Sequence, residues 1–169
     1  SLIGARIDDI TLTKYRQTID KGSPAVRLFA PDGTKHAFFA QVGWAGQGVA
    51  VPGPTTPWTA DGTRLTPTTP VTLSWANATG QTFRITYSID DHYLITATQT
   101  VANMGSAPVV VGSYASVDRH GKPTDPAEAD SVTIHVGPTG YLDGASNFKW
   151  DYDDIEEAAN REVRFASTG

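Results

Sequence analysis

Thr82-Phe83-Arg84-Ile85-Thr86-Tyr87-Ser88-Ile89 is the stretch of sequence that decides the fold class. Phenylalanine, isoleucine and tyrosine fall on every second position, and threonine, arginine and serine fill the positions between them. A period of two is typical of a β-strand with one buried face and one wet face. Antiparallel sheets commonly have such faces, so the stretch predicts one strand of an antiparallel sheet.

Neighbouring runs repeat this pattern. With the first stretch they predict strands over residues 71–76, 82–89, 92–102 and 109–116. The segments between them carry residues that favour tight turns, such as Asp90-Asp91 and Asn77-Ala78-Thr79-Gly80, where glycine is available for a positive φ. Successive strands joined by short turns pair antiparallel, so residues 71–116 are predicted to form a four-stranded meander.

The rest of the chain keeps the same character, with two exceptions. Further strands are predicted over residues 3–12, 26–30, 37–44 and 131–136, with a turn at Pro31-Asp32-Gly33. Residues 45–70 hold five prolines and four glycines and are predicted to form a long irregular connection, of a kind that is often functional. Residues 118–130 form a shorter polar excursion.

Only residues 151–161 have the pattern of a helix. Acidic residues crowd its first turn and Arg161 stands at its end, an arrangement that matches the helix dipole. No internal repeat or linker interrupts the sequence. We therefore predict one all-β domain over residues 1–169, an antiparallel sandwich or open barrel with one short helix near the C-terminus.

Composition restricts the function classes. The 169 residues carry 13 Lys and Arg against 18 Asp and Glu, a formal net charge of −5 with a pI of about 5.2. This balance argues against a nucleic-acid surface and against a polybasic membrane anchor. The sequence has no cysteine, which excludes a disulfide, a thiolate zinc site and a cysteine nucleophile.

The chain start and its hydropathy are also informative. No apolar run approaches the ~18–20 residues that a membrane helix needs. The chain opens Ser1-Leu2-Ile3-Gly4, with neither Met nor a basic leader, which suggests an excised or processed segment.

Four histidines are candidates for chemistry: His36, His92, His120 and His135. A catalytic histidine needs a positioned acid and a metal site needs several ligands brought together, but no H-x-H or H-x-x-x-H pair occurs. His120, in Asp118-Arg119-His120, is the best placed of the four, although a structural role is the more frequent one. The acidic run that starts at Asp151 lacks the spacing of a calcium loop. No catalytic, metal or cofactor residue is therefore assigned.

The tryptophans are the remaining candidates for a functional role. Trp75 lies within a predicted strand and is expected in the core. Trp44 and Trp58 are a candidate ligand or partner surface, because an exposed aromatic ring offers a platform to a sugar ring or an apolar peptide. For Trp58, inside the proline-rich connection, packing as a cap on the sheet is the alternative. The residues by themselves favour a binding or scaffolding domain over an enzyme.

Several stretches resemble one protein family. They are Gly4-Ala5-Arg6-Ile7-Asp8-Asp9-Ile10-Thr11-Leu12-Thr13-Lys14-Tyr15-Arg16, Val26-Arg27-Leu28-Phe29-Ala30-Pro31, Ala37-Phe38-Phe39-Ala40-Gln41-Val42-Gly43-Trp44, Trp58, Asp91-His92-Tyr93-Leu94-Ile95-Thr96-Ala97-Thr98-Gln99-Thr100-Val101-Ala102-Asn103, Gly140-Tyr141-Leu142-Asp143-Gly144 and Val163-Arg164-Phe165-Ala166-Ser167-Thr168-Gly169. Together they resemble the large periplasmic domain of YidC-type membrane protein insertases, in its alphaproteobacterial variant. The last stretch resembles the segment before the G-W tract that leads into the family's second membrane span.

The resemblance implies a fold, a location and partners. The fold would be an antiparallel β-supersandwich similar to galactose mutarotases and carbohydrate-binding proteins. The chain would be a periplasmic domain excised from a multi-pass protein of the cell inner membrane. That parent would insert and fold membrane proteins, alone or with the Sec translocon, and its partners would be SecDF, SecYEG and nascent membrane proteins.

The resemblance implies no chemistry for this domain. The family's insertase activity depends on a groove among membrane helices, and a mutarotase-like fold does not imply mutarotase activity. We expect a non-catalytic scaffold or partner-docking module, with no cofactor, small-molecule substrate or nucleic-acid partner. A groove for an extended ligand is implied, without residues that the sequence can number. A free carbohydrate-binding or mutarotase-like protein is the alternative.

Overall fold

The computed structural model describes residues 1–121 and 135–163, and the chain divides into two compact units, Ser1–His120 and Gly121–Gly169. The elements of the first unit are β1 (Ile10–Arg16), β2 (Ala25–Phe29), β3 (Phe38–Gln47), β4 (Thr59–Ala60), β5 (Val71–Ala76), β6 (Gln81–Ile89), β7 (Ile95–Asn103) and β8 (Val110–Arg119). Those of the second unit are β9 (Gly140–Leu142), β10 (Ala145–Asn147), α2 (Tyr152–Glu157) and the 3-10 turn η1 (Ala159–Arg161).

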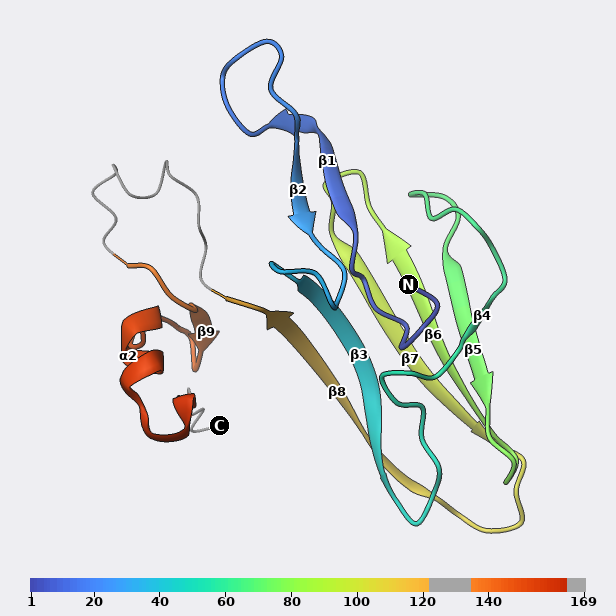
Figure 1. The fold of residues 1–169 in the computed structure, drawn as a ribbon. Coiled ribbons are helices and arrows are strands. Elements are labelled where there is room, and N and C mark those ends of the chain that lie inside the picture. Colours follow the sequence, from blue (N-terminus) through green and yellow to red (C-terminus); the bar gives the residue numbers. More distant parts are fainter. Residues whose placement is uncertain (122–134, 164–169) are drawn as a thin grey trace. The chain divides into compact units, whose positions relative to one another are not determined.

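The strand predicted at residues 82–89 is at the centre of the main sheet. β6 pairs antiparallel with β5 and β7, and the short β4 completes the order β4-β5-β6-β7 (Figure 1). The predicted alternation is confirmed, since Phe83, Ile85 and Tyr87 are buried whereas Arg84 and Ser88 are exposed. The all-β, antiparallel prediction with one short helix near the C-terminus is likewise confirmed.

The pairing predicted for the fourth strand of the meander, over residues 109–116, is wrong. β8 pairs with β3 instead of β7, in a regular ladder from Gln47↔Val110 to Phe38↔Arg119 (Figure 1). The apolar face of β6 requires a second layer to cover it, and β3 supplies that layer. The Trp44 ring of β3 meets the Phe83 ring of β6 at a centroid distance of 5.2 Å. The turn after β7 therefore carries the chain from one sheet to the other.

The strand predicted over residues 3–12 is also wrong in its bounds. β1 begins at Ile10, and the segment before it makes only isolated bridges, such as Ile7↔Ala40. Gly4 and Ala5 have φ values of 72° and 53°, which interrupt an extended strand. The strands predicted over residues 26–30 and 37–44 are confirmed as β2 and β3, the latter three residues longer at its C-terminal end.

The strand predicted over residues 92–102 starts later than its sequence indicates. β7 begins at Ile95, because Tyr93 has a φ of 69° and belongs to the turn after β6. The proline-rich connection over residues 45–70 is mostly irregular after the end of β3, as predicted, and contributes only β4 to the main sheet.

The core of the first unit lies between the two sheets. Its buried members are Ala5, Trp44, Trp58, Leu73, Phe83, Ile85 and Tyr87. The Trp44 and Trp58 rings stack at a centroid distance of 6.3 Å. The Gln99 side chain of β7 also donates a hydrogen bond of 2.7 Å to the carbonyl oxygen of Gly43 in β3. Aromatic packing and this hydrogen bond join the layers.

The second unit holds the short helix. β9 and β10 form a hairpin, and α2 is shorter than the helix predicted over residues 151–161, because the backbone of Ala158 is extended, with a ψ of 142°. Asp151 and Asp154 form a capping box at its start, so the acidic residues there serve the helix end, as their pattern indicates. Of the strand predicted over residues 131–136, positions 131–134 lie outside the described residues, and positions 135 and 136 are not in a strand.

Candidate binding groove

A large apolar hollow of the first unit lies between the β1–β2 hairpin, β3 and the ends of β6 and β7. This hairpin pocket has a volume of about 640 Å³. Representative lining residues are Ile10, Leu12, Leu28, Val42, Ile89 and Ile95. None of its lining residues that the structure describes is charged, so these residues offer a ligand almost only apolar contact.

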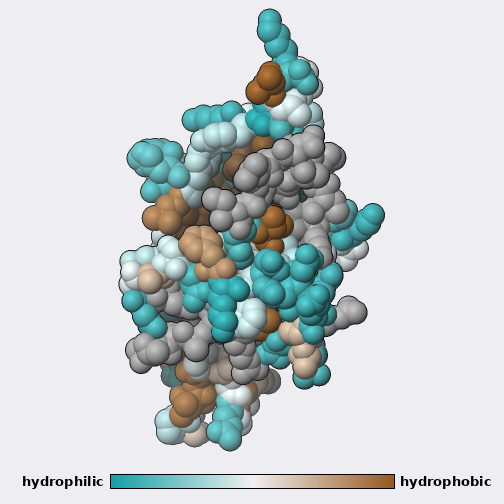
Figure 2. Space-filling model, turned by 90° about the vertical axis from the view of Figure 1, so that its left-hand side faces the viewer, coloured by the Kyte–Doolittle hydropathy of each residue, from teal (hydrophilic) through white to brown (hydrophobic). Residues whose placement is uncertain are grey.

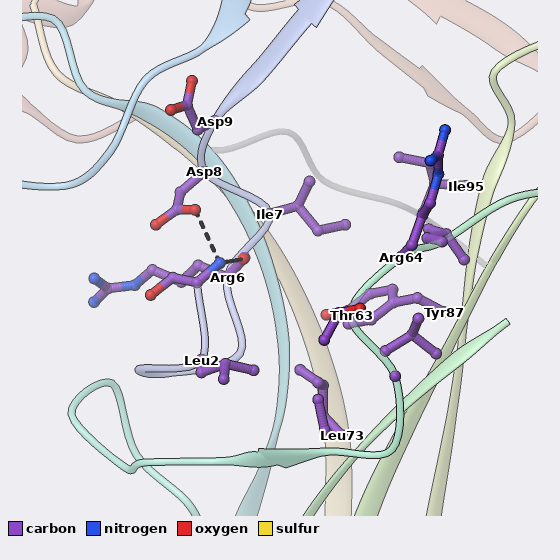
Figure 3. A pocket seen from close by; sticks show the side chains of 15 residues that line it. Leu2, Arg6, Ile7, Asp8, Asp9, Thr63, Arg64, Leu73, Tyr87 and Ile95 are labelled. Atoms are coloured by element: carbon purple, nitrogen blue, oxygen red, sulfur yellow. Dashed lines mark hydrogen bonds and ion pairs between the residues drawn. The ribbon is translucent and has the colours of Figure 1, made fainter.

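A second pocket of about 550 Å³ adjoins the first. It lies between the N-terminal segment and residues 60–65, and Figure 3 shows Ile7 on the first wall with Thr63 and Arg64 across from it. The two pockets share Ile7, Leu65, Tyr87 and Ile95. Because they meet at these residues, we treat them as one elongated groove, apolar in the hairpin pocket and rimmed by charge in the second.

The charged residues of the second pocket are mostly engaged elsewhere. The Arg6 guanidinium lies 2.9 Å from the Asp32 carboxylate and over the Phe39 ring, 4.9 Å from its centroid. The Asp9 carboxylate pairs with Arg27 at 3.0 Å. Arg64 makes no ion pair with any residue that the structure describes. Its cation at the groove mouth is therefore available to an anionic group on a ligand.

Tyr87 forms the shared floor of the groove and is fixed in place. Its hydroxyl donates a hydrogen bond of 3.0 Å to the carbonyl oxygen of Ala5. Burial raises the pKa of Tyr87 from 10.0 to about 12, because the phenolate form would lose its hydration. The Tyr87 side chain is therefore neutral and has a structural role, since its hydrogen bond connects β6 to the N-terminal segment.

Tyr93 stands at the other end of the hairpin pocket, on a turn that Asp90 organises. The Asp90 carboxylate accepts 2.8 Å hydrogen bonds from the backbone N–H groups of His92 and Leu94. These bonds hold Tyr93 at a φ of 69°, which is rare for a bulky side chain. The turn therefore presents a half-exposed aromatic ring to the groove in a fixed position.

The two candidate tryptophans do not line either pocket of the groove. Trp44 and Trp58 are only 5% and 6% exposed, and each ring packs against the other in the core. The Trp58 indole N–H is buried without a partner in the described structure. This placement favours the alternative in which Trp58 caps the sheet. A ligand or partner role for the pair stays a prediction.

Each of the four histidines has surroundings of its own. His36 and His92 are exposed, the His120 ring packs on Phe39 at 6.2 Å, and His135 lies 3.3 Å from the Pro138 carbonyl oxygen. Within residues 1–121 and 135–163, no three His, Asp or Glu side chains cluster as metal ligands would.

Asp118 and Arg119, predicted to begin the polar excursion over residues 118–130, belong instead to the end of β8, where they contact different neighbours. Asp118 accepts a hydrogen bond of 2.8 Å from the Ser116 hydroxyl, and the Arg119 guanidinium lies over the Phe38 ring. Among the described residues, neither pocket of the groove is lined by a histidine or a glutamate.

Sequence analysis did not identify the groove residues. Tyr87 and Ile89 belong to the predicted apolar face of β6, but a period of two does not separate the part of a face that meets the core from the part that lines a groove. Leu28 of β2 is an exposed apolar residue next to Arg27 in the structure. Its sequence context alone did not mark it as part of a groove. Its neighbours across the pocket come from distant parts of the chain, which spacing alone does not join.

Comparison with known proteins gives one family over the full length. A family model described as the YidC periplasmic domain matches residues 1–169. Proteins named membrane protein insertase YidC are similar to this chain. The one from Zymomonas mobilis is 43% identical over 169 residues, which cover 100% of this chain and 29% of that protein. The one from Bradyrhizobium diazoefficiens is 42% identical over 99% of this chain and 27% of its own length.

A third relative from Nitrobacter hamburgensis, also named membrane protein insertase YidC, is 44% identical over 94% of this chain and 26% of its own length. All three sources are alphaproteobacteria, as the resemblance implies. The chain spans less than a third of the length of these relatives. No solved structure matches it. In the part of the chain that the structure describes, no helix has the length and apolar character needed to cross a membrane.

Proposed function

The chain belongs to the family of YidC periplasmic domains, and on that premise we propose that it is a non-catalytic partner-docking domain. Residues 1–169 form one domain of a multi-pass parent in the inner membrane and face the periplasm. The parent inserts and folds membrane proteins, alone or with the Sec translocon. Its partners are SecDF, SecYEG and nascent membrane proteins.

The observation that carries the docking role is the hairpin pocket, whose described lining residues carry no charge. Its lining is apolar along β1, β2, β6 and β7, and it continues past Tyr87 into the second pocket. An elongated apolar groove fits an extended apolar polypeptide segment better than a compact polar ligand. Burying apolar surface there stabilises a complex by about 25 cal/mol per Å² before the costs of association. Segments of membrane proteins carry such surface.

A non-enzymatic role is supported by the chemistry of the groove. Its floor residue is a tyrosine whose pKa lies near 12, too high for a base at neutral pH. The remaining polar groups of the hairpin pocket are amide, hydroxyl and phenol groups of Gln41, Thr11 and Tyr93. None of these is paired with an acid or a base that would activate it.

The carbohydrate-binding alternative has less support. Sugar sites combine an exposed aromatic face with several convergent polar groups. Trp44 and Trp58 are 5% and 6% exposed, and no described residue that lines the hairpin pocket is charged. Tyr93 is the only half-exposed aromatic side chain among the described residues that line it.

Titration of the 169-residue chain separates the two functions. A fluorescent, uncharged peptide of about twelve apolar residues is expected to bind, and mono- and oligosaccharides are not. Leu28→Asp places a charge in the hairpin pocket and should weaken peptide binding at least tenfold. Val110→Asp is the matched control, because Val110 is exposed and lies outside both pockets. Saccharide binding that Leu28→Asp abolishes would overturn the docking role.

The location of the parent is tested in cells of the source organism. Membrane fractions probed with an antibody against this chain should contain a band several times heavier than 18.0 kDa. Protease added from the periplasmic side should degrade the epitope. A free soluble band near 18 kDa would contradict the proposed parent.

A further inference from the structure

The loop that joins β1 to β2 projects from the end of the first unit. We define the hairpin tip as residues 13–24, which Figure 1 shows extending beyond the ends of β5, β6 and β7. Next to the tip, β1 and β2 lose regular pairing: Leu12 faces Val26 but Arg16 already faces Ala25. The residues between Leu12 and Arg16 thus bulge out of the ladder, as bulges at sheet edges commonly do.

Hydrogen bonds within the tip fix its shape. The Ser23 hydroxyl is buried and accepts a bond of 2.8 Å from the backbone N–H of Thr18, while the Ser23 N–H donates to the Asp20 carbonyl oxygen at 3.0 Å. The Gln17 N–H donates to the Pro24 carbonyl oxygen at 3.0 Å. The tip is therefore an ordered loop, and the exposure of its side chains is a property of its fold.

Apolar side chains on this ordered tip face solvent. Ile19 is 104% exposed and Tyr15 is 56% exposed. Figure 2 shows brown apolar atoms beside teal hydrophilic ones at its upper end, where the loop lies in Figure 1. A fully exposed isoleucine on an ordered loop contributes nothing to the core of the unit and is accessible to a partner.

The charge of the tip is opposite to that of the rest of the chain. Lys14, Arg16 and Lys21 stand against the single acidic residue Asp20, whereas ten basic and seventeen acidic residues lie elsewhere. Asp20 is engaged locally, since its carboxylate accepts a 3.2 Å hydrogen bond from the Thr18 hydroxyl. No ion pair among the described residues neutralises the three cations, and all are exposed.

We propose that the hairpin tip is a docking site for the surface of a phospholipid bilayer that contains anionic lipids. Ile19 and Tyr15 enter the headgroup region, and Lys14, Arg16 and Lys21 lie at the level of the lipid phosphates. Apolar side chains at the end of the tip can enter the bilayer while the long basic side chains around them reach the lipid phosphates. The proposal rests on the proposed function in one respect, since a periplasmic domain of a membrane protein has a bilayer beside it.

A tip with three cations binds weakly alone, which is consistent with the net charge of −5 that argues against a polybasic anchor. A domain tethered to a membrane protein requires only weak contact, because tethering makes docking intramolecular. The bilayer contact would then orient the domain and its groove relative to the membrane, rather than recruit it.

Vesicle binding of the 169-residue chain tests the proposal. The chain has no cysteine, so Ile19→Cys can carry a single environment-sensitive dye, with Met104→Cys as the control. Met104 is 86% exposed and lies in the turn after β7, away from the tip in Figure 1. Vesicles with half phosphatidylglycerol should shift the emission of the dye at position 19 to the blue and leave position 104 unchanged. Vesicles of phosphatidylcholine should have little effect on either.

Charge variants make the test specific to the tip. Lys14→Gln with Lys21→Gln should weaken partitioning to phosphatidylglycerol vesicles by roughly 25-fold, at about fivefold for each cation. Lys35→Gln with Arg84→Gln removes the same charge elsewhere, at exposed residues that line neither pocket of the groove, and should leave partitioning unchanged. Raising the salt to about 0.5 M should also release the chain.

The outcomes are distinct. No binding, binding without a change at position 19, or equal weakening by both double variants would overturn the proposal. A chain that binds vesicles through its tip but no apolar peptide would leave this proposal intact and overturn the groove function. Peptide binding without vesicle binding would do the reverse.

Discussion

The Tyr87 hydroxyl donates a 3.0 Å hydrogen bond to the carbonyl oxygen of Ala5, and this bond joins the main sheet to the N-terminal segment. Tyr87 is 8% exposed and Ala5 is 1% exposed, so neither group has ready access to water. Ile7, two residues after Ala5, lines both pockets of the groove, as Tyr87 does. The bond therefore holds a wall of the groove against its floor.

Removing the hydroxyl should destabilise the chain without changing its packing. Tyr87→Phe leaves the Ala5 carbonyl oxygen buried without a partner, which costs about 1–3 kcal/mol. Urea unfolding at neutral pH should show this loss as a lower midpoint with an unchanged slope. Tyr93→Phe is the control, because no hydrogen bond of the Tyr93 hydroxyl lies within the described structure and the residue is half-exposed. Equal effects of the two variants would contradict the role given to the bond.

The same tyrosine should make stability depend on alkaline pH. The pKa of Tyr87 is about 12 in the folded chain against an ordinary value of 10.0, so the folded state keeps its proton longer than the unfolded state. The stability that this residue contributes is therefore complete below pH 10 and is lost as the pH rises towards 12. Between those values, the difference in unfolding free energy between the chain and Tyr87→Phe should shrink by about 1.4 kcal/mol per pH unit. A difference that stays constant up to pH 12 would contradict the raised pKa.

The N-terminal segment also depends on a glycine. Gly4 has a φ of 72°, and a Cβ there would lie 2.5 Å from the Pro54 carbonyl oxygen, a backbone atom that cannot turn aside. Gly4→Ala should therefore cost about 1–3 kcal/mol, measured by thermal unfolding. Gly22→Ala is the matched control, since a Cβ at that position meets nothing within 4 Å. Gly4→Ala should also weaken binding of the apolar peptide, because Ile7 loses its support.

A buried amide network fixes the end of the main sheet away from the hairpin tip. Gln81 is 2% exposed, and its side chain accepts hydrogen bonds from Thr79 and Asn77 and donates to Asn103 at 2.8 Å. Gln81→Met keeps the length of the side chain but leaves these partners unsatisfied. It should cost about 1–3 kcal/mol. Gln47→Met, at the exposed end of β3, should change stability by less than about 0.5 kcal/mol. Hydrogen exchange at the amides of β6 and β7 would locate the loss.

The sequence was sufficient for those features of the fold that depend on neighbours in the chain. Alternation identified β6, and turn residues such as Gly80 identified its hairpin with β5. The transfer of β8 to β3 was not predictable in this way, because it depends on Trp44 covering Phe83 across the two layers. Backbone sterics at Ala5 and Tyr93, both at positive φ, likewise ended strands where side-chain patterns continued.

The groove was less predictable than the fold. It is formed by the β1–β2 hairpin standing against Ile89 and Ile95, and each of these residues has an ordinary strand pattern. The tryptophans were selected because of their rarity, yet their large apolar rings are what the core required. Rare aromatic residues therefore indicate a site only when their burial is known.

Site-specific cross-linking in cells tests the docking role most directly. A photoreactive amino acid at Leu28 of the full-length parent stands in the hairpin pocket, and one at Ser88 stands on the opposite, exposed face of β6. The docking role predicts adducts from position 28 to nascent membrane proteins or to components of the Sec machinery, with few or none from position 88. Adducts from position 88 alone, or none from position 28 while the parent is actively inserting proteins, would contradict it.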